Sequence, residues 1–133
     1  MCLIIKRDQK SKIAQKDIVV FKIVTGEINS TIEETKHTFF ECFPIEIGET
    51  YHSEIRVDKR NESIGIAIHS FKYLKDLLNY LNMDYEDRIF CGYKIHIARC
   101  IIPKGSEYYT GDFEDLGKSY ASSSIEYLRI INK

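Results

Sequence analysis

The segment from Ile101 to Asp112 constrains the fold most, because an apolar run stops there and turn-forming residues begin. Pro103 has no backbone N–H to donate to a sheet, so it belongs at the edge or the end of a strand. Gly105 and Gly111 permit a positive φ, which is typical of turns. The segment therefore predicts a corner that ends one strand.

Polar and aromatic side chains are dense in and after this corner. Lys104, Tyr108 and Tyr109 lie among its turn residues. Tyr120 and Ser122 follow in the stretch Ser-Tyr-Ala-Ser-Ser-Ser. A structural corner whose tyrosines cover the sheet would have this composition, and so would a loop that contacts a ligand. The sequence leaves both interpretations open.

Most of the chain has the pattern of β-strands. The β-branched run 18–24 predicts a central strand, residues 93–102 the longest strand, and residues 124–131 the last one. His96 falls on the polar side of the longest strand, so we expect it to face solvent. Seven or eight strands are expected in all.

One helix is expected over residues of about 70–82, where leucines recur at helical spacing. Ser70 is placed to be its N-cap. Together these patterns predict one globular domain, residues 1–133, of the α+β class, with mostly antiparallel twisted sheets.

Composition excludes several classes of function. The charged share is 29% and the net charge is −1, with scattered Lys and Arg, which argues against nucleic-acid binding and against a polybasic membrane patch. No apolar run is long enough to cross a membrane, and no leader peptide is recognisable, so a cytoplasmic protein is expected. The four cysteines and four histidines lack metal-ligand spacing, so no metal site is expected.

Two kinds of cysteine are expected. Cys42 and Cys100 lie in apolar runs and are predicted to be buried thiols. Cys2 would become an N-terminal nucleophile if Met1 were removed, as in class II amidotransferases. A cysteine in a core strand is the alternative for Cys2.

Three further side chains are candidates for a binding site. Lys22 is the only charge in its strand, and it either reaches solvent or points into a pocket. His69 lies at the predicted strand-to-helix corner, where it is either a hydrogen-bonded corner residue or part of an anion site. Glu126 is either a charge at a sheet edge or a carboxylate at a pocket wall.

Three blocks of the sequence resemble a group of small uncharacterised proteins of phages and gut-type bacteria. The blocks are residues 17–22, 68–71 and 101–122, which contain the series D-I-x-x-x-K, H-S-F, I-P-K-G-S-x-Y-Y-x-G and S-Y-A-S. This resemblance implies a setting rather than an activity, namely a phage-encoded protein in the cytoplasm of its host.

The order of these blocks is also similar, more distantly, to the ADP-ribosyltransferase fold. That resemblance implies that Lys22 stands where an arginine is expected, and that His69-Ser70-Phe71 stands at the serine motif. It also implies that Glu126 or Ser124 falls near the catalytic glutamate, which would stabilise an oxocarbenium-like transition state. NAD would then be the cofactor.

Three hypotheses follow for function. The first is a non-catalytic protein that binds a small nucleotide-like ligand and, in a phage, sequesters a host signalling nucleotide as an anti-defence measure. Its expected ligand-binding residues are Lys22, His69, Ser70, Phe71, Lys104, Tyr108, Tyr109, Tyr120 and Ser122. The second is an ADP-ribosyltransferase-like enzyme with Glu126 as its catalytic residue; otherwise no catalytic residue and no cofactor is expected. The third is an interaction module that inhibits a host protein through its tyrosines.

Overall fold

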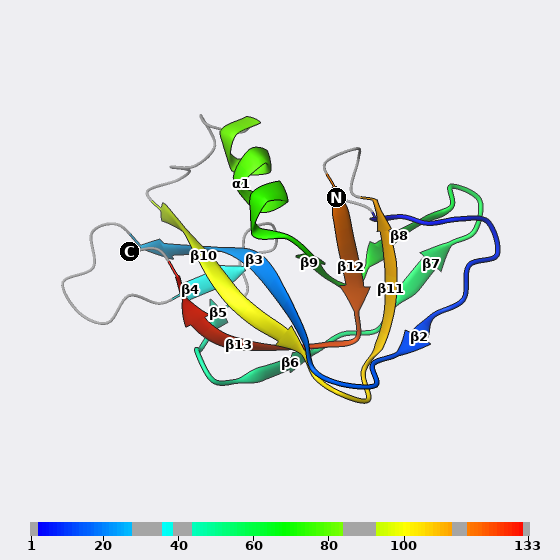
Figure 1. The fold of residues 1–133 in the computed structure, drawn as a ribbon. Helices are drawn as coiled ribbons and strands as arrows, with labels where there is room; N and C mark the ends of the chain where they lie inside the picture. The colour runs from blue at the N-terminus through cyan, green and yellow to red at the C-terminus, as the bar shows by residue number, and fades with distance from the viewer. Residues whose placement is uncertain (1–2, 28–35, 39–43, 84–92, 113–116, 132–133) are drawn as a thin grey trace.

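The structure, a computed structural model, describes residues 3–27, 36–38, 44–83, 93–112 and 117–131 (Figure 1). These residues form a mostly antiparallel sheet of thirteen strands and a single helix, which confirms the predicted α+β class. The number of strands exceeds the expected seven or eight because six of them have only two or three residues.

The strands are β1 (Leu3–Ile4), β2 (Lys12–Ile13), β3 (Ile18–Glu27), β4 (Lys36–Thr38), β5 (Pro44–Ile45), β6 (Thr50–His52), β7 (Arg56–Asp58), β8 (Ser63–Ile66), β9 (Ile68–Phe71), β10 (Tyr93–Ile102), β11 (Glu107–Asp112), β12 (Lys118–Ser122) and β13 (Ser124–Ile130), and the helix is α1 (Leu74–Met83). Their order across the sheet is β6-β13-β10-β3-β9-β12-β11-β1-β8-β7. Strand β2 pairs with β11, and β4 pairs with β3 and β5.

Strands β3 and β10 form the centre of the sheet. They pair antiparallel over ten positions, from Tyr93 opposite Glu27 to Ile102 opposite Ile18. This confirms the predicted central strand and the predicted long strand, which ends at Ile102 immediately before Pro103. The last predicted strand is also confirmed as β13.

The two faces of the central strands contact different partners, because successive side chains of a strand point to opposite sides. We call one side the core face; it carries Val20, Val24 and Cys100. We call the other side the helix face, because its residues Ile23 and Ile97 pack against α1. Both faces of β3 and β10 are therefore covered over much of their length.

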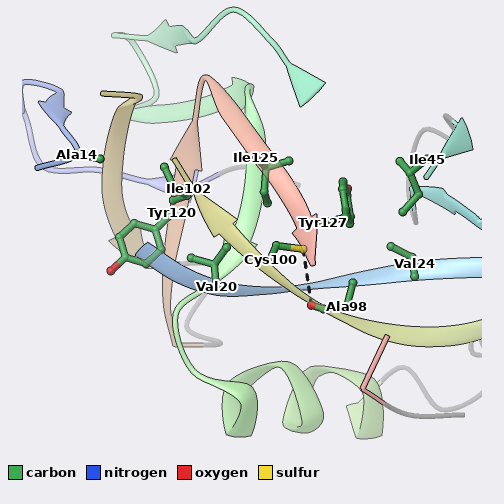
Figure 2. Packing of buried hydrophobic residues seen from close by; sticks show 10 residues of the cluster. All are labelled: Ala14, Val20, Val24, Ile45, Ala98, Cys100, Ile102, Tyr120, Ile125 and Tyr127. Atoms are coloured by element: carbon green, nitrogen blue, oxygen red, sulfur yellow. Dashed lines mark hydrogen bonds between the residues drawn. The ribbon is translucent and has the colours of Figure 1, made fainter. Parts of the chain in front are cut away.

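The cluster on the core face draws on many strands and, among the side chains that the structure describes, on none from α1 (Figure 2). Its buried members are Ala14, Val20, Val24, Ile45, Ala98, Cys100, Ile102, Tyr120, Ile125 and Tyr127. Because these residues come from strands on both sides of β3, the sheet must curve around them. The free thiol of Cys100 is buried here, as the sequence predicts.

The predicted start of the helix is wrong. Ser70 and Phe71 belong to β9, and α1 begins at Leu74 and ends at Met83. Pairing with β12, which sets Ser70 opposite Tyr120, holds these two residues extended. Ser70 is therefore no N-cap, and strand pairing outweighs its capping preference.

The prediction that His96 faces solvent is also wrong. Its side chain is 8% exposed, on the same face of β10 as Ala98 and Cys100. The alternation along β10 indicated that the side with His96 faces solvent. In the structure that side is the core face, and the opposite side packs against α1. A strand covered on both sides does not follow the one-sided rule.

The corner after β10 is confirmed in part. Gly105 has a φ of +90°, as a turn requires, and its N–H donates to the carbonyl of Ala14 at 2.8 Å. Gly111, in contrast, lies inside β11 with no positive φ. A Cβ there would lie 2.2 Å from the carbonyl oxygen of Ile4, so close approach of β1 explains this glycine.

Several sequence predictions fall outside the described residues. They concern Cys2 and Cys42. Within the described ranges, no helix has the length and apolarity needed to cross a membrane. The same ranges contain no group of three or more His, Cys, Asp or Glu side chains that could hold a metal ion.

Candidate functional site: a tyrosine–lysine cluster

Three tyrosines and two lysines from separate parts of the chain meet beside the start of α1. We call this group the tyrosine–lysine cluster, and its members are Lys72, Tyr73, Lys75, Tyr108 and Tyr120. They come from β11, β12, the β9–α1 connection and the first turn of α1.

The centre of the cluster is Tyr120. Its ring packs edge-to-face on Tyr108, with ring centroids 5.7 Å apart. Burial raises the pKa of the Tyr120 hydroxyl, while the positive charge of Lys72 acts in the opposite direction. The hydroxyls of Tyr108 and Tyr73 also act to raise that pKa, so each of them lies near the hydroxyl of Tyr120. Tyr120 therefore keeps its proton at neutral pH and can donate a hydrogen bond.

The Tyr120 hydroxyl points away from the other residues of the core-face cluster (Figure 2). Its ring thus closes the apolar core while its polar end lies at the rim of that face. This arrangement is common for tyrosine, whose ring is apolar and whose hydroxyl needs a polar partner.

Tyr73 supplies the exposed part of the cluster. Its side chain is 41% exposed, and the ammonium groups of Lys72 and Lys75 lie 5.3 Å and 5.6 Å from its ring centroid. Both distances are within the range of cation–π attraction. Two positive charges and an aromatic ring are thus presented together to solvent.

The sequence did not single out Lys72, Tyr73 and Lys75, which fall within the helix expected over residues of about 70–82. The signal that could have found them is the spacing Lys-Tyr-x-Lys immediately after the H-S-F block. An ammonium group can bind a phosphate oxygen and is also attracted to the face of an aromatic ring, so this spacing combines both kinds of contact.

Lys22 and His69 form a separate contact. Lys22 lies half-buried on β3, and its ammonium donates a hydrogen bond to the backbone carbonyl of His69. The ammonium also acts to lower the pKa of Cys100, which places it near the core face. Lys22 therefore points inward and binds the backbone of β9.

The His69 ring contacts the carbonyl of Gly65 at 3.1 Å through Nε2. Burial lowers the pKa of His69, the Gly65 carbonyl opposes this, and the charge of Lys22 adds to the lowering. Phe71, two residues further, packs on Tyr80 of α1 with ring centroids 5.8 Å apart. His69 and Phe71 share the helix face, whereas Ser70 shares the core face with Tyr120.

Two of the predicted serines are buried. Ser122 donates its hydroxyl hydrogen bond toward the carbonyls of Ser124 and Ile68, at 3.0 Å and 3.4 Å. Ser70 is 3% exposed, and its hydroxyl has no hydrogen-bond partner among the described residues. The Ser122 hydroxyl therefore bonds the backbone, while the Ser70 hydroxyl, opposite Tyr120 in the strand pairing, is unsatisfied.

Two other predicted residues lie outside the cluster. The backbone N–H of Lys104 donates to Oδ1 of Asp17 at 2.9 Å, and its side chain is exposed at the corner. Tyr109 is adjacent in sequence to Tyr108 but points to the opposite face, where it packs against Leu3, Ile64 and Ala121.

Glu126 lies on β13, opposite Ile101 of β10 and Thr50 of β6. Its neighbours Ile125 and Tyr127 lie on the core face, so Glu126 lies on the helix face. Lys22 is on the core face of β3, and β10 separates the two strands. The structure therefore does not bring Glu126 to Lys22.

Comparison of the chain with known protein families, with curated proteins and with solved structures finds no match.

Proposed function

We propose that the protein binds a small nucleotide-like ligand at the tyrosine–lysine cluster and does not transform it. The observation that carries this proposal is the meeting of two lysine ammoniums with the exposed ring of Tyr73 and the hydroxyl of Tyr120. In this site the ammoniums of Lys72 and Lys75 bind phosphate oxygens, and the tyrosine rings stack on the base.

Binding fits these residues better than catalysis. A transferase that uses NAD needs a carboxylate beside the group that holds the dinucleotide. Glu126 is the proposed carboxylate of that alternative, and it lies on the opposite face from Lys22 and two strands away. Labelled NAD incubated with the protein should therefore give no turnover, in the wild type as in Glu126→Gln.

The order of the elements supports the proposed likeness to the ADP-ribosyltransferase fold. Strand β3 with Lys22 lies beside β9, which is followed by α1, and β10 on the other side of β3 leads to the corner at Pro103. We propose a protein with this arrangement that retains nucleotide binding in place of the transferase reaction.

Thermal unfolding with ADP-ribose, NAD and a cyclic nucleotide tests the binding. A ligand at one hundred times its Kd adds about 2.7 kcal/mol to the free energy of unfolding. The ligand that does so should lose at least about tenfold in affinity with Lys72→Gln plus Lys75→Gln, since about 1.4 kcal/mol of phosphate contact is removed. Tyr120→Phe should weaken it by less.

Two matched variants control this experiment. Tyr109→Phe removes a tyrosine hydroxyl from the opposite face, and Lys59→Gln removes an exposed charge from the β7–β8 turn. Neither should change the affinity. If no nucleotide stabilises the protein at millimolar concentration, the proposal fails.

The resemblance to phage proteins supports a sequestering role for this binding. A phage-encoded protein that holds a host signalling nucleotide would lower its free concentration and so block host defence. The complex can be denatured by heat and the released ligand analysed by chromatography, which should show that the ligand is chemically unchanged. If a cleaved product is recovered instead, the protein acts as an enzyme and the sequestering role is wrong.

A further inference from the structure

Two arginines face each other across adjacent strands on the helix face. Arg99 of β10 is directly opposite Arg129 of β13 in the antiparallel register. Side chains at such positions share a face of the sheet and lie close together, so two positive charges are held side by side. Strands β13, β10 and β3 run next to one another at this place (Figure 1).

Neither guanidinium forms an ion pair in the described part of the chain, although the carboxylate of Glu126 lies on the same face. The Nε atom of Arg99 is buried there without a hydrogen-bond acceptor, and Arg129 is exposed. Arg56, in contrast, has an ion pair with Glu54 at 3.0 Å. A buried guanidinium N–H without an acceptor is costly, and an opposed pair of like charges adds to that cost.

The surroundings of the two arginines are largely apolar and open to solvent, with Glu126, opposite Ile101, as an acidic neighbour on the same face. Val19 of β3 is exposed, and Ile101 of β10 is half-buried between β3 and β13. Leu128 is the extra residue of β13 where its register with β10 shifts, and it is exposed next to Arg129. Helix α1 packs on Ile23 and its neighbours and leaves this part of the sheet uncovered. We call these five residues, Val19, Arg99, Ile101, Leu128 and Arg129, the arginine patch.

The geometry points to the arginine patch as a docking surface for another protein, one that presents a carboxylate flanked by apolar side chains. The carboxylate would accept hydrogen bonds from both guanidiniums, which form strong bidentate pairs with such groups. The flanking apolar side chains would cover Val19, Ile101 and Leu128. This surface is separate from the tyrosine–lysine cluster, which lies at the rim of the core face.

A protein partner fits the patch better than a nucleic acid or a free phosphate. Exposed apolar side chains lie beside the pair, and a free phosphate would leave them uncovered, whereas a protein partner would bury them. The chain also has a net charge of −1, which gives no broad attraction for a nucleic-acid backbone.

A pair of labelled peptides tests this inference on the full chain. One alternates leucine and glutamate, and the other replaces every glutamate by glutamine. Fluorescence anisotropy should show that the glutamate peptide binds the wild type at least about tenfold more tightly than the glutamine peptide. Arg99→Gln plus Arg129→Gln should abolish that preference, while Arg60→Gln, at an exposed arginine of the β7–β8 turn, should keep it.

If the double variant does not fold, a measurement on the wild type tests the same inference. The Nε–H signal of Arg99 in a nitrogen-15 spectrum of the wild type should shift with the glutamate peptide and stay in place with inorganic phosphate. Equal binding of the two peptides overturns the inference, and so does a signal that moves with phosphate as strongly as with peptide. Arg129→Gln alone, at an exposed position, should already weaken binding several-fold.

Discussion

The core face and the helix face of the sheet are closed by different means. Strands from both halves of the sheet supply the core-face cluster, so the curved sheet wraps around that cluster (Figure 2). The helix face is covered in separate parts: α1 packs on Ile23 and Ile97, and β1 and β8 pack on Ala121. The remaining part, around Arg99, stays open.

The two faces also differ in whether their polar groups have hydrogen-bond partners within the protein. On the core face, Lys22 bonds the backbone of β9 and Ser122 bonds two carbonyls. Arg99, on the open part of the helix face, has instead a buried Nε without a hydrogen-bond acceptor, and the lysines at the rim contact only the ring of Tyr73 among the contacts described above. The core face, which the curved sheet surrounds, thus has little room for ligands. The helix face is covered only in separate places, so parts of its surface stay exposed between them.

The largest expected effect tests whether α1 is needed to close the helix face. Leu77 of α1 is completely buried against the sheet, and its neighbour Leu78 is exposed on the same helix. Leu77→Ala should lower the free energy of unfolding by about 3 kcal/mol, because it leaves a cavity against the sheet. Leu78→Ala should change it by less than about 0.5 kcal/mol in the same denaturant titration. Equal effects would mean that the helix contributes no core of its own.

A second pair of variants tests the cover that β1 provides. Gly111→Ala would drive a Cβ into the carbonyl of Ile4, so β1 must move, at a cost of about 2 kcal/mol. Gly105→Ala meets no atom within 4 Å and has only the cost of its positive φ, about 1 kcal/mol. Hydrogen exchange of β1 amides should rise in the first variant alone. Unchanged exchange there would argue against the close approach.

The sequence was informative wherever one strand's own pattern was sufficient. The β-branched run of β3 and the stop at Pro103 fixed the centre of the sheet before any pairing was known. Both are local effects of side-chain shape and of a missing N–H. The same reasoning failed for Ser70 and His96, whose environments depend on strands distant in the chain.

The candidate site was predictable only in part for the same reason. Tyr108 and Tyr120 were selected as aromatic residues near the corner, and the structure does bring them together. Tyr109 is also an aromatic residue near the corner, but it lies on the opposite face of the sheet, because successive side chains of β11 point to opposite sides. Lys72 and Tyr73 join the cluster only because β9 ends beside β12 and the chain turns there into α1.

A third prediction concerns the closure of the core face at high pH. Burial raises the pKa of the Cys100 thiol from 9.0 to about 12, although Lys22 acts to lower it. Above pH 9 the unfolded chain loses this proton while the folded chain keeps it, so stability falls between pH 9 and about 12. At pH 10 the loss should be about 1.4 kcal/mol, measured as the difference between wild type and Cys100→Ala. Parallel curves for the two proteins would show that solvent reaches the thiol.

The smallest expected effect concerns the open part of the helix face. Opposed like charges on neighbouring strands are destabilising, so Arg129→Gln should raise the free energy of unfolding by about 0.5 kcal/mol. The gain should shrink in high salt, because both charges are then screened. Arg60→Gln, an exposed arginine in a turn, should give no such gain. A substitution that stabilises the protein while weakening its binding to an acidic peptide would show that Arg129 is kept at a cost to the fold, as expected of a residue that serves a partner. A loss of stability in Arg129→Gln would instead mean that the two arginines already share a counter-charge within the chain, and the patch would then be part of the core structure.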